Sequence, residues 1–295
     1  MNDSINSLLS QTINFTNIQV ILVNDGSSDN SEELCLFYQS LYPKNIIYKK
    51  ISHGGLSKAR NVGIKYSLGK YISYLDPDDK WDMNAFEYAY NFFENHTNID
   101  IVGGRIKYFE AKSGYHPLDY KFYKTRVVNL SIEYNCIHLS TASSFFRVSF
   151  MKGKTFDEQV LVGEDAKFVN QYLLAKPLYG VIREAIYHYR WRADHSSILQ
   201  NYIQNSYYYF KSLNFLEFFL INISNFLYNK TLPFLQFLIC YNLLCRIKNK
   251  SIFNVLDKIK IKKYYIIYEN LLRHIEDKYI IEQKIASYKY KLLAL

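Results

Sequence analysis

Glycine is missing from the last 115 residues of this 295-residue chain. All 11 glycines lie between Gly26 and Gly180, and Pro233 is the only proline after position 180. Because glycine and proline mark turns, this division predicts a turn-rich first part and a turn-poor, helical second part. The apolar fraction of 49% and the charged fraction of 21% exclude a disordered chain, and the length is sufficient to bury a core.

Cysteine is also scarce. The four cysteines form no CxxC pair and no metal-ligand spacing, which favours a reduced, cytoplasmic chain over a disulfide scaffold or a zinc site. The N-terminus lacks a basic segment followed by an apolar stretch, so no signal peptide is predicted there. The most apolar run, 232–247, is shorter than the roughly 20 residues of a typical membrane span. A core helix, an interfacial helix and a membrane span all stay open for this run.

Acidic residues become rare toward the C-terminus. Residues 201–295 carry 14 basic and 6 acidic side chains, a net charge of +8, whereas residues 1–200 carry 22 and 21, a net charge of +1. A basic region of this kind predicts an anionic partner such as a membrane surface, or is simply a solvated helical surface. The lysines are not accompanied by a nucleic-acid recognition module, so no nucleic-acid partner is expected.

The first 200 residues alternate between short apolar runs and helical patterns. This alternation predicts an α/β fold with a mostly parallel sheet flanked by helices. In such sheets ligands bind beyond the carboxyl ends of the strands. The expected strands span 19–23, 46–51, 71–75 and 99–102, and the expected helices span 31–41, 57–67 and 84–95.

Two polar turns follow these predicted strands. Asp76-Pro77-Asp78-Asp79 places three carboxylates within four residues, where they repel one another unless a cation or solvent screens them. Hard divalent ions accept one or two such carboxylates together with phosphate oxygens. A solvated turn before a helix is the alternative interpretation.

The second turn, Gly54-Gly55, leads into a helix whose first turn carries Lys58 and Arg60. Helix N-termini and basic side chains both attract phosphate, although this loop matches neither a P-loop nor GxGxxG.

Four segments together resemble the ordered motifs of family 2 glycosyltransferases, and the resemblance covers about residues 1–200. It implies the GT-A fold, a Rossmann-like sheet flanked by helices, followed here by an all-α C-terminal region. The segments are Val23-Asn24-Asp25-Gly26-Ser27-Ser28-Asp29, the run from Gly54 to Gly63, Tyr74-Leu75-Asp76-Pro77-Asp78-Asp79, and Gly163-Glu164-Asp165-Ala166-Lys167-Phe168.

The resemblance also implies residue roles. Asp76 and Asp78 match the DxD pair that binds Mn²⁺ or Mg²⁺ through the nucleotide diphosphate. Asp165 matches the catalytic base of inverting members, and Glu164 beside it orients the acceptor or Asp165 itself. Helix capping is the alternative interpretation of this Glu-Asp pair, because Asp165 begins a helical pattern. The implied nucleotide-sugar-binding residues are Asp25, Gly26, Ser27, His53, Lys58, Arg60, Asp79, Arg190 and Arg192.

The resulting hypothesis is a bacterial, metal-dependent, inverting glycosyltransferase. It moves a sugar from a nucleotide-diphosphate donor, with UDP-sugars as first choice, to a hydroxyl of a capsule or cell-wall polysaccharide or of a lipid-linked glycan. Two alternatives stay open. One is a catalytically inactive, glycosyltransferase-like protein that retains only binding; the other is a nucleotidyltransferase, which shares a similar sheet and metal site.

The N-terminal segment departs from the family pattern. Ile5–Thr12 matches the end of the family's first helix, and nothing before it matches the first strand. The sequence therefore appears about 20–30 residues short at the front, going by the usual length of a strand and helix. A gene start assigned too late is the favoured explanation, and a true truncation with weak nucleotide binding is the alternative.

Two domains are expected. Residues 1–200 form the catalytic domain, and residues 201–295 form several basic helices. These helices are expected to dock on anionic lipid at the inner face of the cell membrane, where lipid-linked acceptors are met, or to hold a homo-oligomer together.

Overall fold

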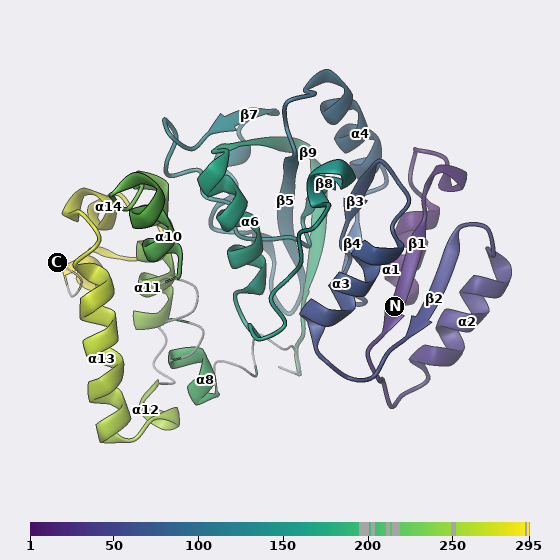
Figure 1. Cartoon of the computed structure of the whole chain (residues 1–295). Helices are drawn as coiled ribbons and strands as arrows, with labels where there is room; N and C mark the ends of the chain where they lie inside the picture. The colour runs from purple at the N-terminus through teal and green to yellow at the C-terminus, as the bar shows by residue number, and fades with distance from the viewer. Residues whose placement is uncertain are drawn as a thin grey trace. The chain divides into compact units, whose positions relative to one another are not determined.

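The computed structural model describes residues 1–194, 201, 204–210, 213, 219–248, 252–292 and 294. The chain divides into two compact units, which are described separately (Figure 1). The first unit comprises Met1–Val127, Ser140–Phe168 and Leu178–Trp191. The second unit comprises Val128–Leu139, Val169–Pro177 and Arg192–Leu295.

The first unit alternates between strands and helices along most of its length. Its helices are α1 (Asn2–Leu9), α2 (Ser31–Leu41), α3 (Leu56–Tyr66), α4 (Ala85–Asn95), α5 (Val148–Met151) and the short 3-10 turns η1 (Phe15–Asn17) and η2 (Asp119–Phe122). Its strands are β1 (Val20–Asn24), β2 (Ile46–Lys50), β3 (Tyr71–Ser73), β4 (Lys80–Trp81), β5 (Ile101–Glu110), β6 (Gly114–Tyr115), β8 (Ser144–Arg147) and β9 (Leu178–Trp191). Two further elements, β7 (Arg126–Asn129) and α6 (Glu164–Ala175), begin in this unit and continue into the second.

The larger sheet has the order β3-β8-β5-β9-β4, with β6 paired to β5 and β7 paired to β9. β5 and β9 run parallel, with Val102 opposite Gly180, whereas β8 runs antiparallel to both β3 and β5, and β4 runs antiparallel to β9. The predicted α/β class is confirmed, but the sheet is mixed rather than mostly parallel. Apolar patterning identifies a buried strand without fixing its direction, since direction depends on where the connections cross the sheet.

β1 and β2 form a separate parallel pair, with Val20 opposite Ile46, and α2 lies beside them (Figure 1). Among the described residues β1 pairs with β2 alone, and no strand joins this pair to the larger sheet.

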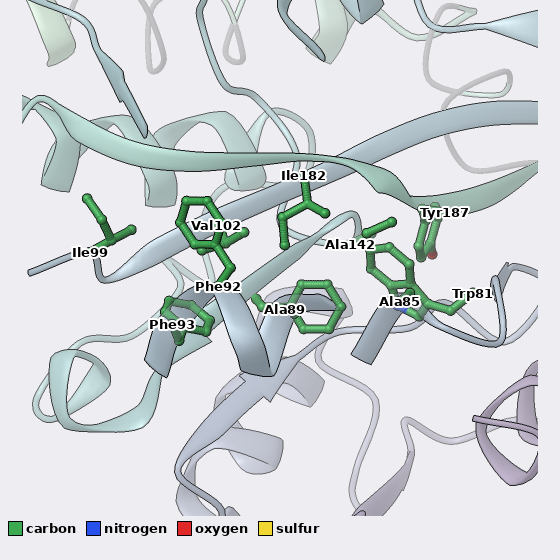
Figure 2. Packing of buried hydrophobic residues seen from close by; sticks show 12 residues of the cluster. Trp81, Ala85, Ala89, Phe92, Phe93, Ile99, Val102, Ala142, Ile182 and Tyr187 are labelled. Atoms are coloured by element: carbon green, nitrogen blue, oxygen red, sulfur yellow. The ribbon is translucent and has the colours of Figure 1, made fainter. Parts of the chain in front are cut away.

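The core of the first unit lies between α4 and the larger sheet. Figure 2 shows Ala89, Phe92 and Phe93 of α4 directed toward Val102 of β5 and Ile182 of β9. The close approach of α4 requires glycine at position 180, since a Cβ there would lie 2.4 Å from Cε1 of Phe92. Trp81 of β4 packs at the same core against Tyr187, so the core also fixes the chain next to the acidic turn.

The second unit is helical over most of its described length, as predicted. Its helices are α8 (Ser206–Tyr209), α10 (Phe219–Tyr228), α11 (Pro233–Ile247), α12 (Ile252–Val255), α13 (Lys258–Leu272), α14 (Asp277–Ile281) and α15 (Tyr288–Leu292). α11 is buried along most of its length, which identifies the apolar run at 232–247 as a core helix. None of the helices in the described part of the chain is long and apolar enough to span a bilayer. Residues 202, 203, 211, 212 and 214–218, within the predicted basic helices, lie outside the described residues.

Candidate active site

Asp25 holds the glycine loop against the end of β1. Its two carboxylate oxygens accept hydrogen bonds of 2.8 Å from the backbone N–H groups of Gly54 and Gly55. Nδ1 of His53 lies 3.1 Å from the same carboxylate. Gly26, whose φ is +79°, follows directly, and a Cβ built there would lie 3.4 Å from Cβ of His53. Three of the predicted nucleotide-binding positions, Asp25, Gly26 and His53, therefore share one corner of the unit, beyond the carboxyl ends of β1 and β2.

Two turns and a helix start at the same corner are fixed by local hydrogen bonds and backbone conformation. Ser27 donates its N–H to Oδ1 of Asn24 at 2.8 Å, which tightens the turn after β1. Gly55 caps α3 with φ +86°, a conformation that disfavours residues with a Cβ. Lys58, in the first turn of α3, directs its ammonium to the carbonyl and hydroxyl of Ser52, both at 3.1 Å.

Arg60 connects the two acidic motifs. Its side chain, on α3, is only 6% exposed and lies 3.1 Å from Oε1 of Glu164 and 3.6 Å from Oδ1 of Asp76. It also donates a short hydrogen bond to Asp165. Burial lowers the pKa of Arg60, but the charges of these three carboxylates more than offset that effect and raise it. The sequence predicted Arg60 beside the nucleotide, whereas the structure places it between the DxD pair and the predicted catalytic base.

The carboxylate of Asp165 is fixed from two sides. Thr141 donates its backbone N–H to Oδ2 at 3.0 Å and its hydroxyl to Oδ1 at 2.6 Å, while Arg60 approaches Oδ1. α6 begins at Glu164, so the prediction that Asp165 lies at a helix N-terminus is confirmed. Three donors on one carboxylate hold it in a single orientation, as a positioned proton acceptor requires.

Glu164 is nearly buried beside two charged neighbours. Burial and the negative charge of Asp165 raise the pKa of Glu164 to about 8, although Arg60 opposes the increase. Glu164 is therefore harder to ionise than a solvent-exposed glutamate.

We predict that Glu164→Gln stabilises the protein at alkaline pH. The pKa of this carboxyl is about 8 when folded and about 4.5 when unfolded. Its protonated form supports the fold below pH 4.5, and that contribution is lost as the pH rises through 8. The amide cannot ionise, so we expect nearly equal stabilities at pH 4 and a gain of about 1–3 kcal/mol for the variant at pH 9. Urea unfolding at both pH values measures this difference. The exposed Glu33→Gln is the control, and a gain that does not grow with pH would contradict the prediction.

The acidic turn lies between β3 and β4. The side chain of Asp76 is partly exposed, but loss of solvent around its carboxyl is the main cause that raises its pKa, and the charge of Arg60 opposes the increase. α1 supports this turn from below, since Ser4 donates its hydroxyl to the carbonyl of Pro77 at 2.7 Å. Gln11, just after α1, donates its amide to the carbonyl of Asp82 at 2.8 Å. The segment 4–11 therefore helps to position the predicted metal ligands.

Asp79 and Arg190 join the turn to β9. Asp79 is 1% exposed, and its Oδ1 accepts the backbone N–H of Arg190 at 2.7 Å. Burial raises the pKa of Asp79 to about 7, and this hydrogen bond opposes the increase. The Arg190 guanidinium donates to the carbonyl of Asp78 at 2.9 Å and pairs with Asp3 and Glu110. Arg190 thus holds the turn through its backbone and its side chain, whereas Arg192 belongs to the second unit and its role stays a prediction.

The donor set at this turn fits a hard divalent cation. Asp76, Glu164 and Asp165 share one buried guanidinium, and Asp78 adds a further carboxylate, so negative charge is in excess. Among the described residues no three His, Cys, Asp or Glu side chains are arranged as a metal centre. Two carboxylates are nevertheless sufficient where phosphate oxygens and water complete the coordination of Mg²⁺ or Mn²⁺.

Sequence reasoning missed Thr141 and the supporting residues of α1. Thr141 is completely buried, and its only signal was the run Ser140-Thr141-Ala142-Ser143 before a strand. Small polar residues at such a position are common in turns, so the run does not single out a functional residue. The contacts of Thr141 with Asp165 depend on the tertiary fold.

The sequence is similar to those of known proteins. Residues 1–153 match the family described as Glycosyl transferase family 2. Over its whole length the chain is 40% identical to the minor teichoic acid biosynthesis protein GgaB of Bacillus subtilis, of which it covers 33%. It is 34% identical to GgaA of the same organism, matching over 97% of this chain and 66% of that protein. The chain therefore spans about a third of the length of GgaB and about two thirds of the length of GgaA.

Solved structures show the same fold. S. aureus TarS 1-349 in complex with UDP-GlcNAc superimposes with a TM-score of 0.71 at 17% identity, covering 95% of this chain and 79% of that one. GalNAc-T7 with UDP, GalNAc and Mn²⁺ superimposes with a TM-score of 0.53 at 15% identity, covering 68% of this chain and 44% of that one. The predicted GT-A fold is confirmed by these likenesses.

Proposed function

The chain belongs to glycosyl transferase family 2, and we propose that it transfers a sugar, with inversion, from a UDP-sugar to a hydroxyl of a cell-wall glycan. One observation carries the proposal: Arg60 brings the Asp-Pro-Asp turn and the Glu164-Asp165 pair into one cluster. The names of the two B. subtilis relatives favour a teichoic acid, a phosphodiester-linked polymer, as the acceptor class. Crystallised TarS holds UDP-GlcNAc or UDP, which supports a UDP-sugar as the donor.

We assign the chemical step to Asp165. As the acceptor oxygen attacks the anomeric carbon, its bond to that carbon forms and the bond from the anomeric carbon to the phosphate oxygen breaks. The acceptor proton goes to the Asp165 carboxylate, and the nucleoside diphosphate leaves with the bonding electrons. Thr141 and Arg60 orient the carboxylate for this transfer, and a positioned base of this kind contributes about 10²–10⁴-fold to the rate.

The donor is assigned to the opposite side of the cluster. Asp25, Gly26, Ser27 and His53 form the corner proposed for the nucleoside. Lys58 is placed to neutralise phosphate at the start of α3. We propose that Asp79 and Arg190 hold the turn against which the donor sugar lies.

A divalent cation, Mn²⁺ or Mg²⁺, is proposed between Asp76, Asp78 and the donor diphosphate. When bound, such an ion neutralises the charge that develops on the leaving diphosphate. Asp76 is already oriented by Arg60, so this chain offers the ion one preset carboxylate and a second on the same turn.

A donor screen tests the function. The full chain is incubated with UDP-, GDP- and CDP-sugars, and release of nucleoside diphosphate is followed. We expect release from one UDP-sugar, a loss of about 100-fold or more after chelation, and recovery with Mn²⁺ or Mg²⁺. Pyrophosphate as the product would indicate a nucleotidyltransferase instead. Tight UDP binding without any turnover would favour the inactive, binding-only alternative.

We further propose that residues 1–200 act as the catalytic domain and that residues 201–295 locate it at the inner face of the membrane. α13 supports this proposal. It buries Tyr264, Tyr268 and Leu271 on one face, while Ile259 and Ile266, two turns apart, are 70% and 58% exposed on the opposite face. Lysines at 258, 262 and 263 flank the two isoleucines. An apolar strip bordered by lysines is typical of helices that lie on anionic bilayers.

We predict that Ile259→Glu/Ile266→Glu weakens binding to phosphatidylglycerol vesicles by at least about tenfold, because each exposed isoleucine that enters a bilayer contributes about 1–3 kcal/mol. Vesicle cosedimentation of the full chain measures this. The matched control is Ile132→Glu/Ile281→Glu, which changes two equally exposed isoleucines elsewhere in the second unit. Equal loss in both double variants would remove α13 as the docking face. A change in oligomeric state confined to the α13 variant would favour the alternative, a homo-oligomer interface.

A further inference from the structure

The second unit contains a hollow of about 460 Å³. It is lined by the end of α10 and the turn that follows, the start of α11, the segment after α13 and the start of α14. None of its lining residues belongs to the cluster around Arg60, and the proposed chemistry leaves it without a role.

Buried hydrogen bonds fix the walls of this hollow. The side chain of Gln236, on α11, is buried and donates to the carbonyl of Thr231 at 2.9 Å. Its own carbonyl oxygen accepts the backbone N–H of Glu276 at 2.8 Å, so it ties α11 to the segment before α14. Next to the lining residue Asn225, the hydroxyl of Ser224 donates to the carbonyl of Lys230 at 2.7 Å. These hydrogen bonds connect the segments that line the hollow, so the backbone positions of the lining residues are fixed relative to one another.

The charge of the lining is unbalanced. Among the lining residues Lys230, Arg273 and Lys278 are basic and Glu276 is the only carboxylate, which gives a formal charge of +2 when histidine is not counted. Glu276 is already paired with Lys278 at 2.7 Å. Among the described residues neither Lys230 nor Arg273 lies within 4.0 Å of a carboxylate oxygen. Lys230, between α10 and α11, and Arg273, just after α13, thus line the hollow without a carboxylate oxygen within 4.0 Å among the described residues.

The lining identifies the class of ligand. Besides the charged groups it presents the polar side chains of Asn225 and Thr231, together with the apolar side chains of Pro233, Ile275 and Tyr279. Cations bind phosphate oxygens, and neutral hydroxyl and amide groups suit the hydroxyls of a polyol. The volume is larger than one phosphate ion requires and suits a short segment of a chain.

We propose that this hollow binds a phosphodiester segment of the acceptor glycan, with Lys230 and Arg273 on the phosphate oxygens. The inference rests on the proposed function, because it names a holding site for the anionic acceptor outside the reacting cluster. Binding there would retain a polymeric acceptor between successive transfers and would not affect a small uncharged acceptor.

Direct binding tests the proposal without any turnover. A fluorescently labelled oligomer of glycerol phosphate is titrated with the full chain at low salt, in the absence of donor, and its anisotropy is followed. We expect Lys230→Gln/Arg273→Gln to weaken binding about tenfold or more, since each charge-assisted contact to phosphate contributes to affinity. Lys44→Gln/Lys289→Gln removes the same charge from exposed sites away from the hollow and is expected to stay within about twofold of the parent. Thermal unfolding of both double variants checks that the fold is retained.

Several outcomes would overturn the proposal. Equal weakening in both double variants would show that binding depends on the net charge of the protein and not on the hollow. Competition by inorganic phosphate at the same concentration as the oligomer would indicate a simple anion site. Binding of anionic vesicles that requires Lys230 and Arg273, without binding of the oligomer, would assign the hollow to a lipid headgroup. Because release of nucleoside diphosphate is measured separately, a chain that turns over its donor but fails these tests keeps its proposed function and loses this site.

Discussion

Asp165→Asn is expected to lower kcat for sugar transfer by about 10³-fold while the affinity for UDP changes by less than about twofold. The substitution removes the proton acceptor, and an amide oxygen cannot take the acceptor proton at neutral pH. The nucleotide corner around Asp25 is formed by other residues, so donor binding has no reason to change. Single-turnover kinetics with saturating acceptor, together with calorimetric titration of UDP, separate the two effects.

Folding must be checked in the same experiment. Oδ2 of Asp165 faces the N–H of Thr141 and Oδ1 faces Arg60, so an amide group must point its own N–H at a donor on one side. We expect a loss of stability of about 1–3 kcal/mol from this mismatch. Asp157→Asn is the matched control, since it makes the same change at an ion pair with Lys167 outside the cluster. Transfer that survives in Asp165→Asn at more than about a tenth of the parental rate would exclude Asp165 as the base.

The parts of the site that lie within single turns were predictable from the sequence. Helix 31–41 matches α2 at both ends, because its apolar spacing and its flanking turn residues are local signals. The acidic turn and the start of α6 at Glu164 follow from capping and turn chemistry in the same way. The resemblance to a known family added roles to these local features.

Long-range pairings could not be predicted in this way. Arg60 and Asp165 are separated by 105 residues, and no local pattern indicates that a helix cation will be buried between two carboxylate motifs. Thr141 presents the same difficulty, since small polar residues before a strand have many uses. The direction of β8 also escaped prediction, because an apolar strand has the same composition whether it runs parallel or antiparallel to its neighbours.

Arg60→Gln is expected to produce the largest combined loss of stability and activity. The guanidinium is buried among Asp76, Glu164 and Asp165, and its removal leaves carboxylates in a crowded site without a counter-charge. Breaking a buried ion pair by removing one partner costs about 3–5 kcal/mol. For a chain of this size that corresponds to a fall in Tm of about 10 °C. We also expect transfer to fall by about 100-fold or more, because Arg60 orients Asp165.

The pH dependence distinguishes electrostatics from lost packing. Without Arg60 the folded-state pKa values of Asp76 and Glu164, which burial already raises, rise further above their unfolded values. Stability is then retained below the unfolded values near pH 4 and is lost as the pH rises through the folded ones. The gap between variant and parent should therefore be small at pH 5 and large at pH 8, whereas a packing defect would give a constant gap.

Two further variants complete the test. Arg60→Lys keeps the charge but lacks the planar fork, so it is expected to recover part of the stability and little of the activity. Arg105→Gln, which breaks a paired hydrogen bond to Asp119 at 2.8 and 2.7 Å, removes an arginine from the same unit at a more exposed position and should cost less stability than Arg60→Gln. A parental rate of transfer in a folded Arg60→Gln protein would contradict the role given to Arg60. Because the same residue joins the DxD turn to the proposed base, that result would also remove the observation on which the proposed function rests.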